Sequence, residues 1–165
     1  MDFARLMRHL VTPRWAVRRA FSPATLKVIE SSVRQSEKAH SGQVLFAIQG
    51  SLDLVPLMRD VHARAHAIDV FSHLRVWDTE HNNGILIYVL LADRNVEIVA
   101  DRGIHKLVAQ SEWETICRTM ERQFRAGEFE AGALAGIESV TSLLAHHFPR
   151  GAGASNELPD KPVLM

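Results

Sequence analysis

The longest uninterrupted run of apolar residues in the chain lies at 85–92 and predicts a buried β-strand. A half-exposed strand would alternate between apolar and polar side chains, and this run does not. Residues 95–100 do alternate, with Val96, Ile98 and Ala100 on one side. The few polar residues between the two segments suit a tight turn. We therefore predict a β-hairpin whose first strand is buried.

Periodic segments on both sides of this hairpin predict the other elements. Ser22 and Pro23 suit the N-cap and the first position of a helix, and Ser111 with Glu114 has the spacing of a capping box. The predicted helices cover residues 22–40, 54–74, 111–126 and 128–148, and an additional strand covers residues 43–49. Because a helix connects this strand to the hairpin, the two neighbouring strands should run parallel, and the sheet should be mixed.

The two ends of the chain differ in composition from the middle. Residues 1–20 contain five arginines and one aspartate, with apolar side chains between them, which is typical of a basic amphipathic arm. Such an arm binds an anionic membrane surface or a partner, or it docks on its own domain through Leu6, Leu10 and Trp15. From Pro149 on, three prolines and two glycines predict a mobile tail. The predicted organisation is an N-terminal extension over 1–21, a domain over 22–148 and a flexible tail over 149–165.

Overall composition limits the classes of function. With 165 residues and 47% apolar content, the chain is long enough to form one globular domain. Its 19 basic and 19 acidic residues cancel, so we expect no nucleic-acid partner. The single Cys117 is interpreted as a buried structural thiol. The sequence has no run long and apolar enough to span a bilayer and no cleavable leader, which predicts a soluble cytoplasmic protein, peripheral to the inner membrane if the arm binds lipid.

Polar residues flank the open end of the predicted hairpin. Because antiparallel strands reverse direction, residues 78–83 should approach residues 101–105. Carboxylate and amide oxygens are the ligands that calcium and magnesium prefer, and a neighbouring arginine suits a phosphate group. The candidate metal ligands are Asp78, Asn82 and Asp101, and the candidate anion or phosphate contacts are Arg102 and His105. A structural interpretation also stands, in which residues 82–84 form a turn and Asp101 pairs with Arg102.

Several motifs in this region resemble the TPM domain family, which includes thylakoid-lumen proteins of photosystem repair and many bacterial proteins. The motifs are Trp77, Asn83-Gly84, Asp93-Arg94, Val96 to Val99, Asp101 to Ile104, Phe124 to Phe129 and Ala131-Gly132, and the resemblance covers residues 22–148. It implies a three-layer α/β/α sandwich with a small mixed sheet. It also implies divalent-cation binding, as in some members, and acid phosphatase activity, as in a plant member. This chain has Asn82 where many members have aspartate, which alters the implied ligand set.

Two functions follow from these observations. The sequence contains no phosphate-binding glycine-rich loop, no Gly-x-Ser-x-Gly elbow and no Cys-His pair in a catalytic context. We therefore predict a TPM-like module that acts as a non-catalytic interaction domain for a protein partner and binds a divalent cation at the sheet edge. The alternative is a weak metal-dependent acid phosphatase, which would use metal-bound water because no side chain stands out as a nucleophile.

Overall fold

The predicted hairpin lies in a mixed four-stranded sheet in the computed structural model, which describes residues 3–12, 14–52, 62–151 and 155–165. The strands are β1 (Gln43–Gln49), β2 (Gly84–Leu90), β3 (Asn95–Ala100) and β4 (Val163–Leu164), in the spatial order β3-β2-β1-β4. β2 and β3 are antiparallel, and β1 and β2 are parallel, as predicted. β2 ends earlier than expected, because Leu91–Asp93 form a 3-10 turn, η1, and Arg94 takes a left-handed conformation with a φ of 49°.

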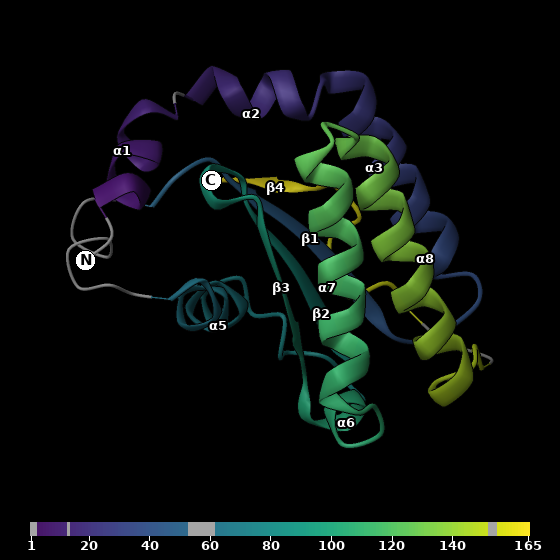
Figure 1. Cartoon of the computed structure of the whole chain (residues 1–165). Coiled ribbons are helices and arrows are strands. Elements are labelled where there is room, and N and C mark those ends of the chain that lie inside the picture. Colours follow the sequence, from purple (N-terminus) through teal and green to yellow (C-terminus); the bar gives the residue numbers. More distant parts are fainter. Residues whose placement is uncertain (1–2, 13, 53–61, 152–154) are drawn as a thin grey trace.

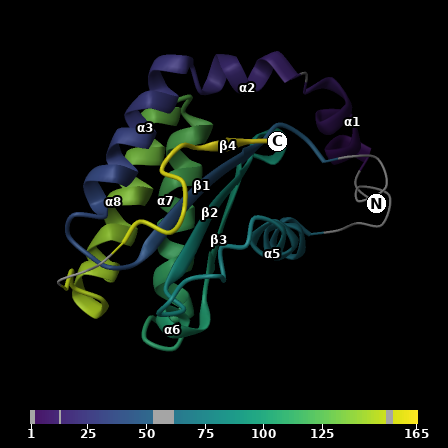
Figure 2. The same cartoon turned by 180° about the vertical axis from the view of Figure 1, so that it is seen from behind.

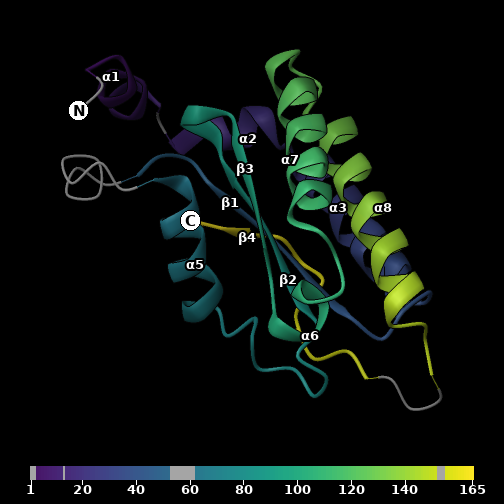
Figure 3. The same cartoon turned by 60° about the horizontal axis from the view of Figure 1, so that its bottom comes forward.

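Helices cover both faces of this sheet (Figure 3). On one face lie α3 (Pro23–Ser36), α7 (Gln110–Arg125) and α8 (Phe129–His147), and on the other lies α5 (Ala63–His73). Alternate residues of β2 enter two apolar cores, with Ile85, Ile87 and Val89 in the first and Leu86, Tyr88 and Leu90 in the second. Burial on both faces is the reason why the apolar run has no polar interruption. The three-layer α/β/α sandwich is confirmed.

Local hydrogen bonds decide where the helices begin. Ser22 caps α3 as predicted, because its hydroxyl oxygen accepts the Thr25 amide at 3.1 Å. The capping box predicted from Ser111 is wrong. The N-cap residue of α7 is Ala109, and the side chain of Glu112 reaches back to accept its amide at 3.2 Å. Of the second helix predicted from the sequence, the part before α5 falls mainly on residues 53–61, which lie outside the described residues.

The C-terminal segment differs from the mobile tail expected over residues 149–165. β4 pairs in parallel with β1, and the segment before it crosses the sheet edge (Figure 2). The side-chain oxygen of Gln43 accepts the amides of Glu157 at 2.8 Å and Leu158 at 3.2 Å. Proline and glycine content indicates local mobility, but residues 155–165 are held by tertiary contacts, and β4 pairs with Ala47 and Ile48 at the edge of β1.

The N-terminal arm forms two helices, α1 (Phe3–Val11) and α2 (Arg14–Ala20), which lie across one end of the molecule (Figure 1). Leu6 packs against the second core, and Val17 is buried in the first, so the arm docks on its own domain. Leu6 docks as predicted, whereas Leu10 and Trp15, which were also expected to dock, are exposed. Among the described helices, none is both long enough and apolar enough to cross a membrane.

Candidate functional site

The two polar segments at the open end of the hairpin meet, as predicted. The amide of Gly103 donates to the carbonyl of Asn82 at 2.8 Å. The second segment then forms α6 (Arg102–His105), a short helix. Residues 78–83 and 101–105 together form what we term the Asp101 edge. This edge lies at the opposite end of the molecule from α1 and α2 (Figure 1).

Close backbone contacts shape the Asp101 edge. Asn82 has a left-handed backbone with a φ of 51°, which asparagine tolerates better than most residues. A Cβ atom on Gly103 would lie 2.5 Å from the carbonyl oxygen of Asn82 and 2.7 Å from that of His81. The absence of a side chain at Gly103 therefore lets two carbonyl oxygens approach the start of α6.

Asp101 is the buried acidic residue of this edge, with 6% of its surface exposed. Its Oδ1 atom caps α6 by accepting the amide of Arg102 at 2.7 Å, so the contact between these neighbours is a helix cap. Its Oδ2 atom is buried and has no hydrogen-bond partner among the described residues. The same is true of the side-chain oxygen of Asn83. Because a buried oxygen without a partner is unfavourable, both atoms favour the approach of a donor or a cation.

The other candidate residues lie nearer the surface. Asp78 is exposed, and its carboxylate forms an ion pair with Arg75 at 2.6 Å. Asn82, Arg102 and His105 are also exposed. Within the described part of the chain, no three His, Cys, Asp or Glu side chains are grouped so that they could hold a metal ion. A cation at this edge would therefore depend on amide and backbone oxygens beside Asp101.

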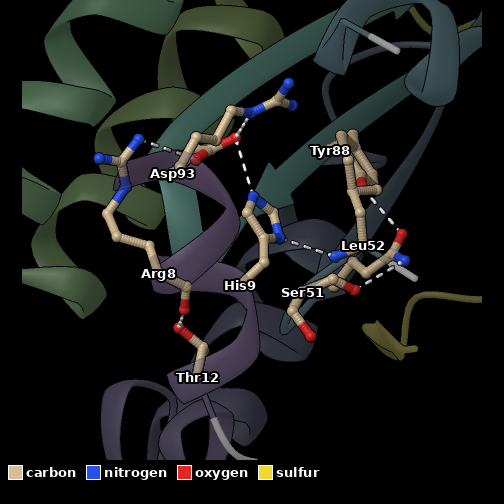
Figure 4. Close-up of polar contacts among 9 residues, drawn as sticks. Arg8, His9, Thr12, Ser51, Leu52, Tyr88 and Asp93 are labelled. Carbon is tan, nitrogen blue, oxygen red and sulfur yellow. Dashed lines mark hydrogen bonds and ion pairs between the residues drawn. The ribbon is translucent and has the colours of Figure 1, made fainter. Parts of the chain in front are cut away.

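A second polar group lies at the other end of the sheet, where the sequence pattern did not predict one (Figure 4). The Asp93 carboxylate in η1 lies 2.9 Å from Arg5 Nε, 3.2 Å from His9 Nε2 and 3.5 Å from Arg8 Nη2, all in α1. These four residues form the Asp93 cluster. Arg5 and Asp93 are 88 positions apart, so no local pattern relates them. The only sequence signal was the spacing of the three basic residues, which puts them on one side of a helix.

His9 connects the Asp93 cluster to the end of β1. The amide of Leu52 donates to His9 Nδ1 at 2.9 Å, so we assign the imidazole proton to Nε2, which faces Asp93. Burial favours a higher pKa for Asp93, but hydrogen bonds from Arg5 and His9 outweigh it, and the net pKa is lowered. Because His9 Nδ1 accepts the Leu52 amide and Nε2 lies 3.2 Å from the Asp93 carboxylate, His9 and Asp93 hold α1 on the domain.

Tyr88 adds a buried polar network beside the Asp93 cluster (Figure 4). Its hydroxyl donates to the side-chain oxygen of Gln49 at 2.8 Å, and His66 Nε2 lies 2.8 Å from the same oxygen. Burial, and then the Asp93 carboxylate, raise the pKa of Tyr88, so its phenol stays protonated at neutral pH. The network therefore orders the carboxyl ends of β1 and β2.

The surroundings of the single cysteine are those of a structural thiol. Cys117 lies in α7, and burial, followed by the Glu97 carboxylate, raises its pKa to about 12. Because the thiolate is the reactive form of cysteine, this side chain is unreactive at neutral pH.

Asp93→Asn is expected to release α1 from the domain and to lower the free energy of unfolding by about 2 kcal/mol, because an amide cannot neutralise the guanidinium groups of Arg5 and Arg8. Hydrogen exchange measured by mass spectrometry should become fast over residues 5–11. Since the pKa of Asp93 is lowered from 3.8, the stabilisation is present above that pH and should be lost as the pH falls further. Glu114→Gln, which breaks an exposed pair with Arg118, is the control and should leave α1 protected. Unchanged exchange in Asp93→Asn would mean that apolar contacts alone hold α1.

Comparisons with known proteins agree with this fold. A family model described as the TPM domain matches residues 18–143. The solution structure of the BA42 protein from the psychrophilic bacterium Bizionia argentinensis is similar, with 29% identity and a TM-score of 0.77 over 88% of this chain and 95% of that chain. The N-terminal domain of a protein from P. gingivalis has the same fold, with 17% identity and a TM-score of 0.63 over 85% of this chain and 95% of that chain. No curated protein matches the sequence. Because the family model spans most of the chain, the protein belongs to the TPM domain family.

Proposed function

We propose that this TPM-domain protein is a binding module that holds a divalent cation at the Asp101 edge and contacts a protein partner there. One observation carries the proposal, namely the buried Oδ2 atom of Asp101, which has no hydrogen-bond partner among the described residues. A carboxylate oxygen in such a position is costly unless a cation or a donor reaches it. A calcium or magnesium ion would supply the missing positive charge.

Other oxygen atoms of the Asp101 edge are of the kinds that bind a hard cation. The side-chain oxygen of Asn83 is also buried without a partner, and the carbonyls of His81 and Asn82 lie against Gly103. Calcium accepts mixed sets of carboxylate, amide and backbone oxygens, with water completing the shell, whereas magnesium demands a stricter octahedron. We therefore expect calcium to bind more tightly than magnesium.

Surface residues extend this set toward a partner. Asp78 would join the ligands on leaving its ion pair with Arg75, which is exposed to solvent and therefore weak. Arg102 and His105 are exposed on α6, next to Asp101. An acidic side chain of a partner would thus meet both the cation and these cationic or hydrogen-bonding side chains.

Calcium at about one hundred times its Kd is expected to raise the melting temperature by about 5–10 °C, because only the folded state assembles the site. Asp101→Asn should abolish this rise. It should change the metal-free protein by less than about 0.5 kcal/mol, since asparagine also caps a helix. Asp69→Asn, which changes an exposed aspartate of α5, is the control and should keep the full response. If the melting temperature of the unmodified protein does not change as calcium is added, the proposal is wrong.

A weak metal-dependent acid phosphatase is the second candidate, favoured by the exposure of Arg102 and His105 beside Asp101. A guanidinium group matches phosphate oxygens in a bidentate manner, and a bound cation supplies an activated water. Hydrolysis of p-nitrophenyl phosphate, measured with and without calcium or magnesium, separates the two candidates. Metal-dependent hydrolysis that is lost in Arg102→Gln would support the phosphatase. Calcium-dependent stabilisation without hydrolysis would support the binding module.

A further inference from the structure

The surface formed by α1 and α2 exposes apolar side chains that a helix in a soluble domain normally buries. Met7, Leu10, Val11 and Trp15 are 41%, 56%, 67% and 60% exposed. Arg5 and His9 face the domain beside Leu6, because they bind the Asp93 carboxylate (Figure 4). The helix is thus turned with apolar residues outward, and such a patch on a folded protein indicates a surface for binding.

A cleft of about 970 Å³ lies beside these residues, between the arm, η1 and the turn that joins α7 to α8. Its cationic lining consists of Arg8, Arg19, Arg94 and Arg125. Two of these arginines form ion pairs, Arg8 with Asp93 at 3.5 Å and Arg125 with Glu121 at 3.1 Å. Arg19 is exposed to solvent. Since the whole chain has no net charge, this concentration of arginine is a local feature of the surface.

Apolar and cationic residues alternate along the same surface. Val11 and Trp15 line the cleft together with Arg8 and Arg19, so the two kinds of side chain share one wall. A helix face with tryptophan and leucine beside arginine is typical of helices that lie in the headgroup region of a membrane. This mixture favours a lipid surface over an acidic protein. An acidic protein surface would bind the arginines but would offer no apolar surface to the outward leucine and valine.

We propose that the α1–α2 surface binds an anionic lipid bilayer. The exposed apolar side chains enter the boundary between headgroups and acyl chains, and the arginines of the cleft bind lipid phosphates. Figure 1 shows this surface at the opposite end of the molecule from α6, so a bound protein keeps the Asp101 edge in solution. The family match begins at residue 18, after α1. The proposal does not depend on cation binding, and either can fail alone.

Vesicle sedimentation tests the proposal with the full chain. At low salt, phosphatidylcholine vesicles that contain about one third phosphatidylglycerol should sediment with the protein, and pure phosphatidylcholine vesicles should not. Ionic strength of about 0.5 M should release the protein, because salt screens the arginines from the lipid phosphates. Failure to sediment with the anionic vesicles at low salt would overturn the proposal, and so would equal sedimentation with both kinds of vesicle.

Paired charge variants locate the binding surface. Arg8→Gln combined with Arg19→Gln should weaken binding by about 30-fold, whereas Lys38→Gln combined with Lys106→Gln, which removes as much charge elsewhere, should not. In the first variant, Arg5 and His9 still hold α1 on the domain, so the loss reports on lipid contacts. Equal binding by the two double variants would contradict the proposal.

Tryptophan fluorescence reports on insertion. Anionic vesicles should shift the emission to shorter wavelength, because Trp15 leaves water for the membrane interface. Trp77→Phe should keep the shift and Trp15→Phe should lose it, although both side chains are exposed in the free protein. A shift that persists in Trp15→Phe would overturn the proposal. Binding of an acidic peptide or of inorganic phosphate without vesicle binding would also overturn it.

Discussion

Gly84→Ala is expected to destabilise the folded protein by about 3 kcal/mol, the largest effect that we predict for a change of one methyl group. A Cβ atom on Gly84 would lie 2.0 Å from the backbone carbonyl oxygen of Val76. Val76 is fully buried, so its backbone cannot move aside without separating the loop before β2 from the sheet. The loss should appear in urea unfolding as a lower midpoint with an unchanged slope.

The same substitution should also disturb the Asp101 edge, because the loop pushed away by the new methyl group carries residues 78–83. Gly151→Ala is the matched control, since no atom lies within 4 Å of a Cβ atom built there. Its stability should equal that of the unmodified protein. A loss of less than about 1 kcal/mol in Gly84→Ala would mean that the loop adapts freely, against our interpretation of this contact.

Glu37→Gln is expected to stabilise the protein by about 3 kcal/mol at pH 8 and to have little effect near pH 4.5. Burial, and then the Asp160 carboxylate of the C-terminal segment, raise the pKa of Glu37 from 4.5 to about 7. The folded protein therefore keeps this proton where the unfolded chain releases it. Stability from Glu37 is complete below pH 4.5 and is lost as the pH rises to about 7. A neutral glutamine removes that loss.

Urea unfolding of both proteins between pH 5 and pH 8, at intervals of about one unit, measures this difference. His40 acts in the opposite direction, because burial lowers its pKa and its protonation in acid destabilises the fold. That contribution is common to both proteins and cancels in the comparison. Glu138→Gln, an exposed change on α8, should give no gain at any pH. A gain in Glu37→Gln that is the same at pH 5 and pH 8 would reject the assigned cause.

The periodicity of the sequence was enough to predict most of the elements. An apolar run followed by an alternating segment gave β2 and β3 within two residues at each end, and helical spacing located α3, α7 and α8. These elements bury a continuous face or stripe, so their side-chain pattern repeats over several turns or residue pairs. β4 has two residues and no such pattern. It pairs with Ala47 and Ile48 of β1, and the segment before it is held by Gln43, by an ion pair between Arg34 and Asp160, and by the buried side chain of Leu158.

Part of the candidate site could be predicted for the same reason. Antiparallel pairing requires the residues before β2 to approach those after β3, and Asn82 and Gly103 do meet. The sequence could not decide which oxygens remain without a donor. That depends on burial and on the helix cap, which leave Asp101 Oδ2 and the Asn83 side-chain oxygen unpartnered among the described residues.

The sequence by itself determined the chemistry of the N-terminal arm, namely five arginines interleaved with apolar residues. Only the tertiary structure decided its orientation. Helical spacing determines which side chains share a face. Which face is buried depends on the side chains of the rest of the fold that the helix packs against. Here η1 offers the Asp93 carboxylate, which binds Arg5 and His9 on the domain side of α1 and leaves Leu10 exposed. Arg5 and Asp93 are 88 positions apart, so no local pattern could predict their contact. Periodicity shows which side chains share a face of a helix or strand, but not which other element that face contacts.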